Sequence, residues 1–234
     1  MNADSFLDAL ERQGVAVFTL KDAARIIGKP KEYAKLFLSR LAKRKKILRI
    51  ERGKYCQNNV SLLEAASNLA YPAYVSFLSA LAFHRLTTQI PVLVEVACAR
   101  QRKEASFGGT RIEFVKLKKE AIFGFRRYGN AFVAEPEKSV IDGLYAPNHL
   151  PLSEAFYAIK HGKLDTNKLC DYADKLGSSI VKRRLGFLLE TAGMQASGRP
   201  NYVKASRYAL LNPMLGSKGK RDKKWMLVVN EVLE

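Results

Sequence analysis

Apolar positions at the start of the chain follow first a helical and then a strand-like spacing. Phe6 and Leu10 share the buried face of an expected first helix, and residues 15–20 alternate as a short strand. The segment Thr19-Leu20-Lys21-Asp22 has the layout of a capping box, in which the hydroxyl accepts from a backbone N–H and the acid reaches back. This segment predicts a second helix that begins there and stops at Gly28.

A third helix is expected from about Pro30 to Lys43, because proline suits the first position of a helix. Apolar residues at i, i+3, i+4 and i+7 form one stripe toward the core: Ala34, Phe37, Leu38 and Leu41. The residues that project the opposite way, or lie on its flanks, are Glu32, Lys35, Leu36, Ser39, Arg40 and Lys43. Such a surface can enter a major groove, but an ordinary surface helix also has a charged outer face.

The next segment favours the DNA-binding interpretation. Residues 45–55 alternate apolar and polar positions around Gly53 and carry several lysines and arginines, which predicts a basic β-hairpin. Two short helices, a basic helix and a basic hairpin, in that order, are the elements of a winged helix-turn-helix. We therefore expect a DNA-binding domain over residues 1–58, ending near the polar pair Asn58-Asn59.

The remaining sequence mixes helical and strand-like patterns without a strict alternation. Helices are expected over residues 61–71, 76–86, 135–144, 153–160, 165–176 and 179–191, strands over 92–99, 111–117, 125–128, 132–134 and 225–233, and a further element over 202–211. This mixture favours an α+β fold, in which the winged helix is followed by a larger mixed α+β domain over residues 59–234.

The net charge of +18 is concentrated in three segments. Lysines and arginines outnumber acids by eleven to two in residues 29–54, by nine to three in residues 100–128 and by eight to one in residues 199–224. Such segments favour a polyanionic partner, because neutralised phosphates release condensed counterions on binding. The chain lacks an apolar run of about eighteen residues and a basic, then apolar, N-terminus, so we expect a cytoplasmic protein without a membrane partner.

We expect the partner to be double-stranded operator DNA. The predicted base readers are Lys31, Lys35, Ser39 and Arg40, with Leu36 available for a thymine methyl group. In the hairpin, Arg49, Arg52 and Lys54 would make backbone or minor-groove contacts, which position the protein. Further predicted DNA contacts are Lys29, Lys43, Arg100, Arg102 and Lys103. The sequence leaves open whether a monomer or a homodimer binds.

The sequence carries no signature of an enzyme, and we expect no catalytic residue, cofactor or metal. Cys56, Cys98 and Cys170 lack the paired spacing of a disulfide framework or zinc site, and the three histidines are far apart. Walker and dinucleotide-binding glycine motifs are also missing.

Two alternative functions stay open at this point. Glu95 and Glu113 lie on strands expected to be adjacent, with Lys116 nearby, and these residues could hold a divalent metal at a nuclease centre. The basic segments are also compatible with a general nucleic-acid-binding module that prefers RNA.

Six segments, taken in their order and spacing, resemble one known family. They are Phe18-Thr19 with Ala23-Ala24, Leu41 through Tyr55, Tyr74 through His84, Ala134 through Asp142, Arg184 through Glu190, and Lys223-Lys224-Trp225. On these segments the chain resembles the AbiEi family, the antitoxin and transcriptional regulator of the AbiE type IV toxin-antitoxin and phage-defence systems.

The resemblance implies an N-terminal winged helix that represses its own operon. It also implies a C-terminal domain that supplies antitoxicity against a nucleotidyltransferase-like toxin encoded beside it, without requiring direct contact with that toxin. Phe187 to Glu190 would be packing residues, Glu137 and Asp142 would belong to a structural helix, and basic strips of the C-terminal domain would touch flanking DNA. The basic segment around Lys218 to Lys224 departs from the family pattern and has no role implied by it.

Overall fold

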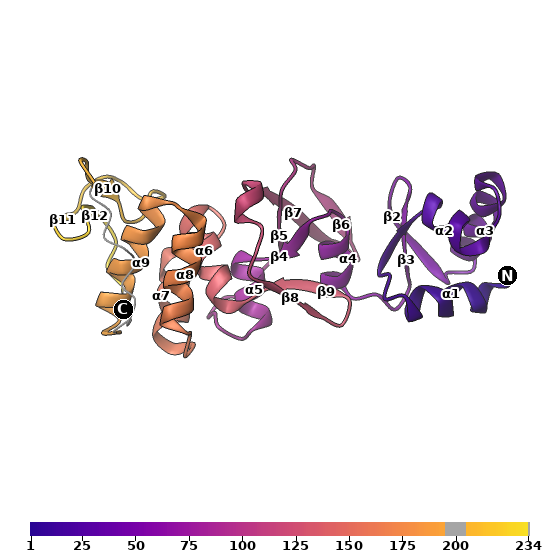
Figure 1. The fold of residues 1–234 in the computed structure, drawn as a ribbon, viewed down its shortest axis with the longest axis horizontal. Coiled ribbons are helices and arrows are strands. Elements are labelled where there is room, and N and C mark those ends of the chain that lie inside the picture. The colour runs from indigo at the N-terminus through magenta and orange to yellow at the C-terminus, as the bar shows by residue number, and fades with distance from the viewer. Residues whose placement is uncertain (195–204, 234) are drawn as a thin grey trace. The chain divides into compact units, whose positions relative to one another are not determined.

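The computed structural model describes residues 1–194 and 205–233, and its mixture of helices and sheets confirms the α+β class. The chain forms two compact units, and Figure 1 labels the helices and strands that belong to them. Unit 1 comprises Met1–Val75, Val92–Leu117 and Arg126–Val133, and unit 2 comprises Ser76–Pro91, Lys118–Phe125 and Ala134–Glu234. The expected boundary near residue 58 falls within unit 1, so the division into domains of residues 1–58 and 59–234 stays a prediction.

The N-terminal part of unit 1 is a winged helix-turn-helix, as expected. Its elements are α1 (Ala3–Arg12), β1 (Val17–Thr19), α2 (Leu20–Ile27), α3 (Lys31–Lys43), β2 (Ile47–Glu51) and β3 (Lys54–Gln57). The three strands pair in the antiparallel order β1-β3-β2. Helices α2 and α3 form the helix-turn-helix, and the β2–β3 hairpin, residues 47–57, is the wing.

Local hydrogen bonds explain where α2 begins and ends. The Thr19 hydroxyl accepts from the Asp22 backbone N–H at 3.2 Å, and the Asp22 carboxylate accepts from the Thr19 N–H at 2.9 Å, which completes the predicted capping box. The strand expected to reach Leu20 ends at Thr19, because the capped helix already includes Leu20. Gly28 ends the helix with a φ of 69°, a left-handed conformation that glycine adopts without strain.

Buried side chains from all of these elements form one small core. Phe6 packs edge-on against Phe18, with ring centroids 5.6 Å apart, and against Phe37 at 5.4 Å. Leu38 of α3 and Ile47 of the wing are also buried in this cluster. Because α3 and the wing share one core, their backbones are held in a fixed arrangement, from which the exposed side chains extend.

A six-stranded sheet forms the rest of unit 1. Its strands are β4 (Ala73–Val75), β5 (Val94–Cys98), β6 (Ala105–Phe107), β7 (Thr110–Lys116), β8 (Phe125–Tyr128) and β9 (Ala131–Ala134), in the order β6-β7-β5-β4-β9-β8. Helix α4 (Leu62–Asn68) precedes β4 and starts at a capping box between Ser61 and Glu64. Strands β4 and β6 were not expected. The ends of strands β5, β7, β8 and β9 lie within two residues of the predicted ends.

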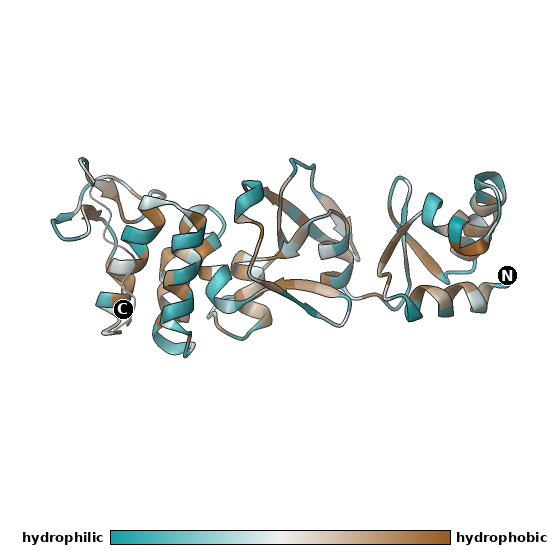
Figure 2. Cartoon of the chain, in the orientation of Figure 1, coloured by the Kyte–Doolittle hydropathy of each residue, from teal (hydrophilic) through white to brown (hydrophobic). Residues whose placement is uncertain are grey.

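Unit 2 is mainly helical. Its helices are α5 (Phe77–Phe83), α6 (Pro136–Tyr145), α7 (Leu152–His161), α8 (Thr166–Leu176) and α9 (Ser179–Thr191), with a 3₁₀ turn at Lys119–Ala121. The outward turns of α8 are largely hydrophilic, whereas its buried residues include Leu169 and Ala173 (Figure 2).

A small sheet completes unit 2. It pairs β10 (Ala209–Leu210), β12 (Leu227–Val229) and β11 (Lys220–Asp222) in that order. The strand expected over residues 225–233 is therefore shorter than predicted, and the basic loop before it contains β11. The first residues of the element expected over 202–211, and part of the basic segment 199–224, lie outside the described residues.

Candidate nucleic-acid interface

Helix α3 buries one side and exposes the other, as its sequence pattern predicts. Ala34, Leu38 and Leu41 are buried in the core of the winged helix. On the opposite side, Leu36 is 53% exposed and Ser39 is exposed as well. An apolar side chain that stays this exposed on a compact domain is free to contact a partner.

The cations of α3 have no acidic partner among the residues that the structure describes. Five exposed lysines and arginines belong to α3 or to the turn before it: Lys29, Lys31, Lys35, Arg40 and Lys43. No acid among residues 1–194 and 205–233 forms an ion pair with any of them. The positive charge of this surface is therefore not neutralised by the described protein, which is the condition for attracting a row of phosphates.

The wing adds two further exposed cations. Arg52 occupies the turn between β2 and β3, next to Gly53, whose φ of 80° permits the tight reversal. The Arg49 guanidinium donates to the Glu51 carbonyl at 3.3 Å and is exposed. Both residues keep their charge at the surface, as a wing that contacts DNA backbone requires.

Two of the predicted DNA contacts, Lys54 and Arg102, lie instead around one acid. The Arg102 guanidinium donates to the Glu51 carboxylate, and the Lys54 ammonium lies 3.1 Å from the same carboxylate. Both cations also donate to the Leu69 carbonyl, at 2.6 Å from Arg102 and 2.5 Å from Lys54. Arg102 lies 4.5 Å from the Phe114 ring centroid. These contacts give both cations a structural role, and their assignment to DNA stays untested.

The electrostatics of Glu51 agree with this geometry. Burial raises the pKa of the Glu51 carboxyl, but hydrogen bonds from Arg102 and Lys54 outweigh burial and hold the pKa below its ordinary value. The neighbouring residues Arg100 and Lys103 are exposed on the loop between β5 and β6. They remain available to a partner, whereas Arg102 is engaged by Glu51 and Leu69.

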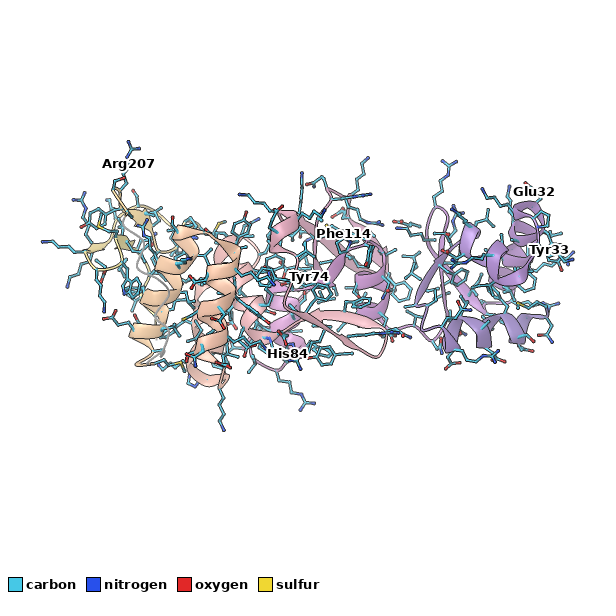
Figure 3. All side chains as sticks on the ribbon, in the orientation of Figure 1. Glu32, Tyr33, Tyr74, His84, Phe114 and Arg207 are labelled. Atoms are coloured by element: carbon cyan, nitrogen blue, oxygen red, sulfur yellow. The ribbon has the colours of Figure 1, made fainter. Side chains whose placement is uncertain are left out.

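The sequence reasoning missed one exposed residue of α3. The Tyr33 side chain is 49% exposed, and its ring lies parallel to that of Phe37 with centroids 6.5 Å apart. Glu32 and Tyr33 lie on the outer side of α3, away from the wing (Figure 3). The sequence could have shown its exposure, because Tyr33 is not one of the residues of the predicted apolar stripe, which are Ala34, Phe37, Leu38 and Leu41.

The structure brings together two of the three residues of the nuclease alternative, Glu95 and Glu113, but not Lys116. Glu95 and Glu113 are register partners on the adjacent parallel strands β5 and β7, as expected. Lys116 follows Glu113 by three positions, and odd spacing on a strand places two side chains on opposite faces of the sheet. Lys116 therefore does not lie on the same face of the sheet as Glu113. Among the residues that the structure describes, no group of three His, Cys, Asp or Glu side chains is arranged to hold a metal.

The cysteines and helices add little to the choice of function. Cys56, Cys98 and Cys170 are buried free thiols, and burial raises the pKa of both Cys56 and Cys170 to about 11. None of the described helices is long and apolar enough to cross a membrane.

Comparison with known proteins adds to this picture of the N-terminal surface. Residues 5–56, from α1 to the wing, match the family model described as "Transcriptional regulator, AbiEi antitoxin". We refer to residues 5–56, which match this family model, as the AbiEi domain. The resemblance predicted from the sequence is confirmed over this AbiEi domain, and over the rest of the chain it stays a prediction. The family description is that of a regulatory protein, and the match covers 52 of the 234 residues.

A solved structure has a similar fold. The crystal structure of the RV2827C protein from Mycobacterium tuberculosis is 11% identical in sequence to this chain, with a TM-score of 0.61. The alignment covers 96% of this chain and 90% of that chain, so the two share a fold over nearly their whole length. At this identity the likeness concerns the fold alone. No curated protein matches the chain.

Proposed function

We propose that the protein is a sequence-specific DNA-binding repressor of its own operon and the antitoxin of a type IV toxin-antitoxin pair. Its toxin would be a nucleotidyltransferase-like protein encoded by the neighbouring gene. The observation that carries the DNA-binding part is the exposed, unneutralised positive charge of α3, from Lys31 to Lys43, within an AbiEi domain.

In this proposal α3 lies in the major groove of the operator. Lys31, Lys35, Ser39 and Arg40 reach base edges or the adjacent phosphates, and Leu36 contacts a thymine methyl group. Lys29 and Lys43 stand at the two ends of the helix and contact phosphates on either side of the groove.

The wing and the β5–β6 loop position the protein on the duplex. Arg49 and Arg52 contact the backbone or the minor groove, and Arg100 with Lys103 extends the positive surface. Each neutralised phosphate steepens the salt dependence by about 0.9 in a plot of log affinity against log salt concentration. Lys54 and Arg102 are left out of this group, since both are bound to Glu51.

An electrophoretic mobility-shift experiment tests the DNA-binding part. The full chain is mixed with labelled duplex from upstream of its own gene, and complexes are challenged with unlabelled copies of that duplex or with unrelated DNA of equal length. We expect the specific competitor to remove the complex at a dose at least about a thousandfold lower than the unrelated competitor. Equal loss with both competitors contradicts a sequence-specific repressor.

A growth experiment tests the antitoxin part separately. The adjacent gene is induced alone and together with the full chain, expressed from a promoter that this protein does not regulate. We expect growth arrest in the first culture and growth in the second. Continued arrest when both proteins are present at measured, comparable levels contradicts the antitoxin role, whatever the mobility shift shows.

A further inference from the structure

The strongly basic segment from Lys29 to Lys54 contains two acids, and the structure treats them differently. Glu51 accepts hydrogen bonds from Lys54 and Arg102, so its charge is compensated inside unit 1. Glu32 is exposed, and among the described residues it has neither an ion pair nor a side-chain hydrogen bond. The contacts of Glu51 therefore show a structural role, whereas the described part of the chain shows no side-chain partner for Glu32.

The position of Glu32 on α3 is central to the exposed side. At about 100° per residue, Glu32 lies within about 40° of Leu36, Ser39 and Lys43, and nearly opposite the buried Leu41. Glu32 is also in the first turn of the helix, the part of a recognition helix that reaches the bases in helix-turn-helix proteins. Figure 3 places it on the outer side of α3. A duplex that meets the exposed side of α3 thus meets this carboxylate.

An acid at this place weakens binding to every DNA sequence, because it repels the phosphates that the surrounding lysines attract. It becomes favourable only where a hydrogen-bond donor on a base edge meets it. In the major groove, cytosine offers its N4 amino group as a donor, whereas guanine offers only acceptors and thymine an acceptor and a methyl group. Adenine pairs its amino donor with the acceptor N7, which repels a carboxylate.

We propose that Glu32 is a specificity-determining residue of the operator complex. Its carboxylate accepts a hydrogen bond from the N4 amino group of one cytosine in the major groove and rejects the other bases at that position. This inference rests on the proposed DNA-binding function and names one base pair of the site that function requires.

A purely structural explanation makes a different prediction. A carboxylate in the first turn of a helix interacts favourably with the helix dipole, and that interaction needs no DNA. In that case replacing Glu32 would lower the melting temperature slightly and leave base preference unchanged. Base preference is therefore the decisive measurement, and stability is the accompanying one.

Selection from a duplex library with a random central segment provides the test. The full chain, Glu32→Gln, Glu32→Ala and Glu11→Gln are each used to enrich bound duplexes, which are then sequenced. Glu11 is an exposed acid of α1, so Glu11→Gln removes the same charge elsewhere on the AbiEi domain. Gln keeps the shape of the Glu32 side chain, which guards against a failure to fold.

We expect the unmodified chain and Glu11→Gln to enrich the same motif, which contains one fixed C·G pair. Both Glu32 variants should lose the preference for C·G at that position and keep the preferences at all other positions. Replacing this pair by T·A should then weaken binding of the unmodified chain about tenfold or more, and that of Glu32→Ala less than about twofold. Glu32→Gln should also bind unrelated duplex more tightly than Glu11→Gln does.

Three outcomes would overturn the inference. If the Glu32 variants enrich the same base at every position, Glu32 reads no base, although the protein remains a specific DNA-binding repressor. If both variants lose preference at all positions together, the residue supports the helix rather than one contact. If the unmodified chain enriches no motif, the proposed function fails and the inference fails with it.

Discussion

The carboxylate of Glu51, in the wing, accepts a hydrogen bond from the guanidinium of Arg102, in the loop after β5. Lys54 shares the same carboxylate, and both cations donate to the Leu69 carbonyl. The Glu51 carboxylate and the Leu69 carbonyl thus bind both Lys54 and Arg102. From the sequence alone, both cations were expected to contact DNA. The arrangement ties the wing to the segments of unit 1 that carry Leu69 and Arg102.

Arg102→Ala should destabilise the protein, because it removes donors from Glu51 and Leu69 while both acceptors stay partly buried. We expect a loss of about 1–2 kcal/mol in the free energy of unfolding, since the side chains of Arg102 and Glu51 remain 20% and 32% exposed. Urea unfolding measures the change. Arg100→Ala, which removes an exposed cation from the same loop, serves as the control and should leave stability within about 0.5 kcal/mol. Equal stability of the two variants contradicts a structural role for Arg102.

The stabilisation by Glu51 should depend on pH. The pKa of Glu51 in the folded protein lies below its ordinary value of 4.5, so folding favours the ionised carboxyl. Its contribution is fully present above the ordinary pKa and is lost as the pH falls through the lowered value. The stability difference between the unmodified chain and Arg102→Ala should therefore be largest near about pH 7 and shrink by about pH 3. A difference that stays constant across this range would show that Glu51 does not carry the effect.

The winged helix could be predicted because each of its elements has a signal a few residues long. The Thr19–Asp22 capping box fixes the start of α2, and the alternation around Gly53 defines the wing. Strands β4 and β6 were missed for the opposite reason. Each has three residues, too few for an alternating pattern, and its strand character comes from pairing, as between Ala105 and Ile112.

The sequence shows where the positive charges lie along the chain, but it does not show which of them are neutralised by acids within the fold. Arg100, Arg102 and Lys103 look alike within one basic loop, yet the partner of Arg102 lies 51 residues away along the chain. The same limit applies to the acids. Glu32 and Glu51 are both isolated acids in a basic segment, and only the fold shows that Glu51 is paired with cations. Neutralisation of a charge is a tertiary property, whereas a capping box or a turn is a local one.

Asp142→Ala should destabilise unit 2 strongly. The side chains of Lys138 and Asp142 form an ion pair within α6 at 0% exposure each, and Ser76 donates to Asp142 at 2.8 Å. Burial lowers the pKa of Lys138, and the charge of Asp142 opposes that shift, so the variant removes the group that keeps the ammonium charged. We expect a loss of about 3–5 kcal/mol by urea unfolding.

The double variant Lys138→Met with Asp142→Leu is the matched control for this buried pair. It replaces both charges by apolar groups of similar volume, so we expect it to be more stable than Asp142→Ala. If the double variant is the less stable of the two, the pair contributes more than mutual charge compensation and the explanation is wrong.

Gly186→Ala should disturb the contact between α9 and the C-terminal sheet. A Cβ at Gly186 would lie 2.1 Å from the nearest atom of the Trp225 ring, which is held by a 2.8 Å hydrogen bond from Nε1 to Glu190. Overpacking costs about 1–3 kcal/mol and outweighs the roughly 1 kcal/mol that alanine gains over glycine in a helix. Because Trp225 is the single tryptophan, its fluorescence should shift to longer wavelength.

Gly216→Ala is the control for this position, since a Cβ at Gly216 would meet no atom of the described residues within 4 Å, its two chain neighbours apart. It should leave both the emission spectrum and the unfolding midpoint unchanged. An unshifted spectrum for Gly186→Ala as well would mean that α9 and Trp225 are not packed as described.

Arg40→Ala and Arg52→Ala should weaken DNA binding in different ways, because one residue is on α3 and the other at the tip of the wing. Loss of Arg40 should reduce affinity for the operator by about tenfold and relax discrimination against mismatched sites. Loss of Arg52 should weaken binding to all duplexes alike and lower the slope of log affinity against log salt concentration by about one. Lys160→Ala on α7 removes an equal charge from unit 2 and is the control. Titrations of operator and unrelated duplex at several salt concentrations give all of these quantities, and identical profiles for the two arginine variants would contradict the division between reading and positioning.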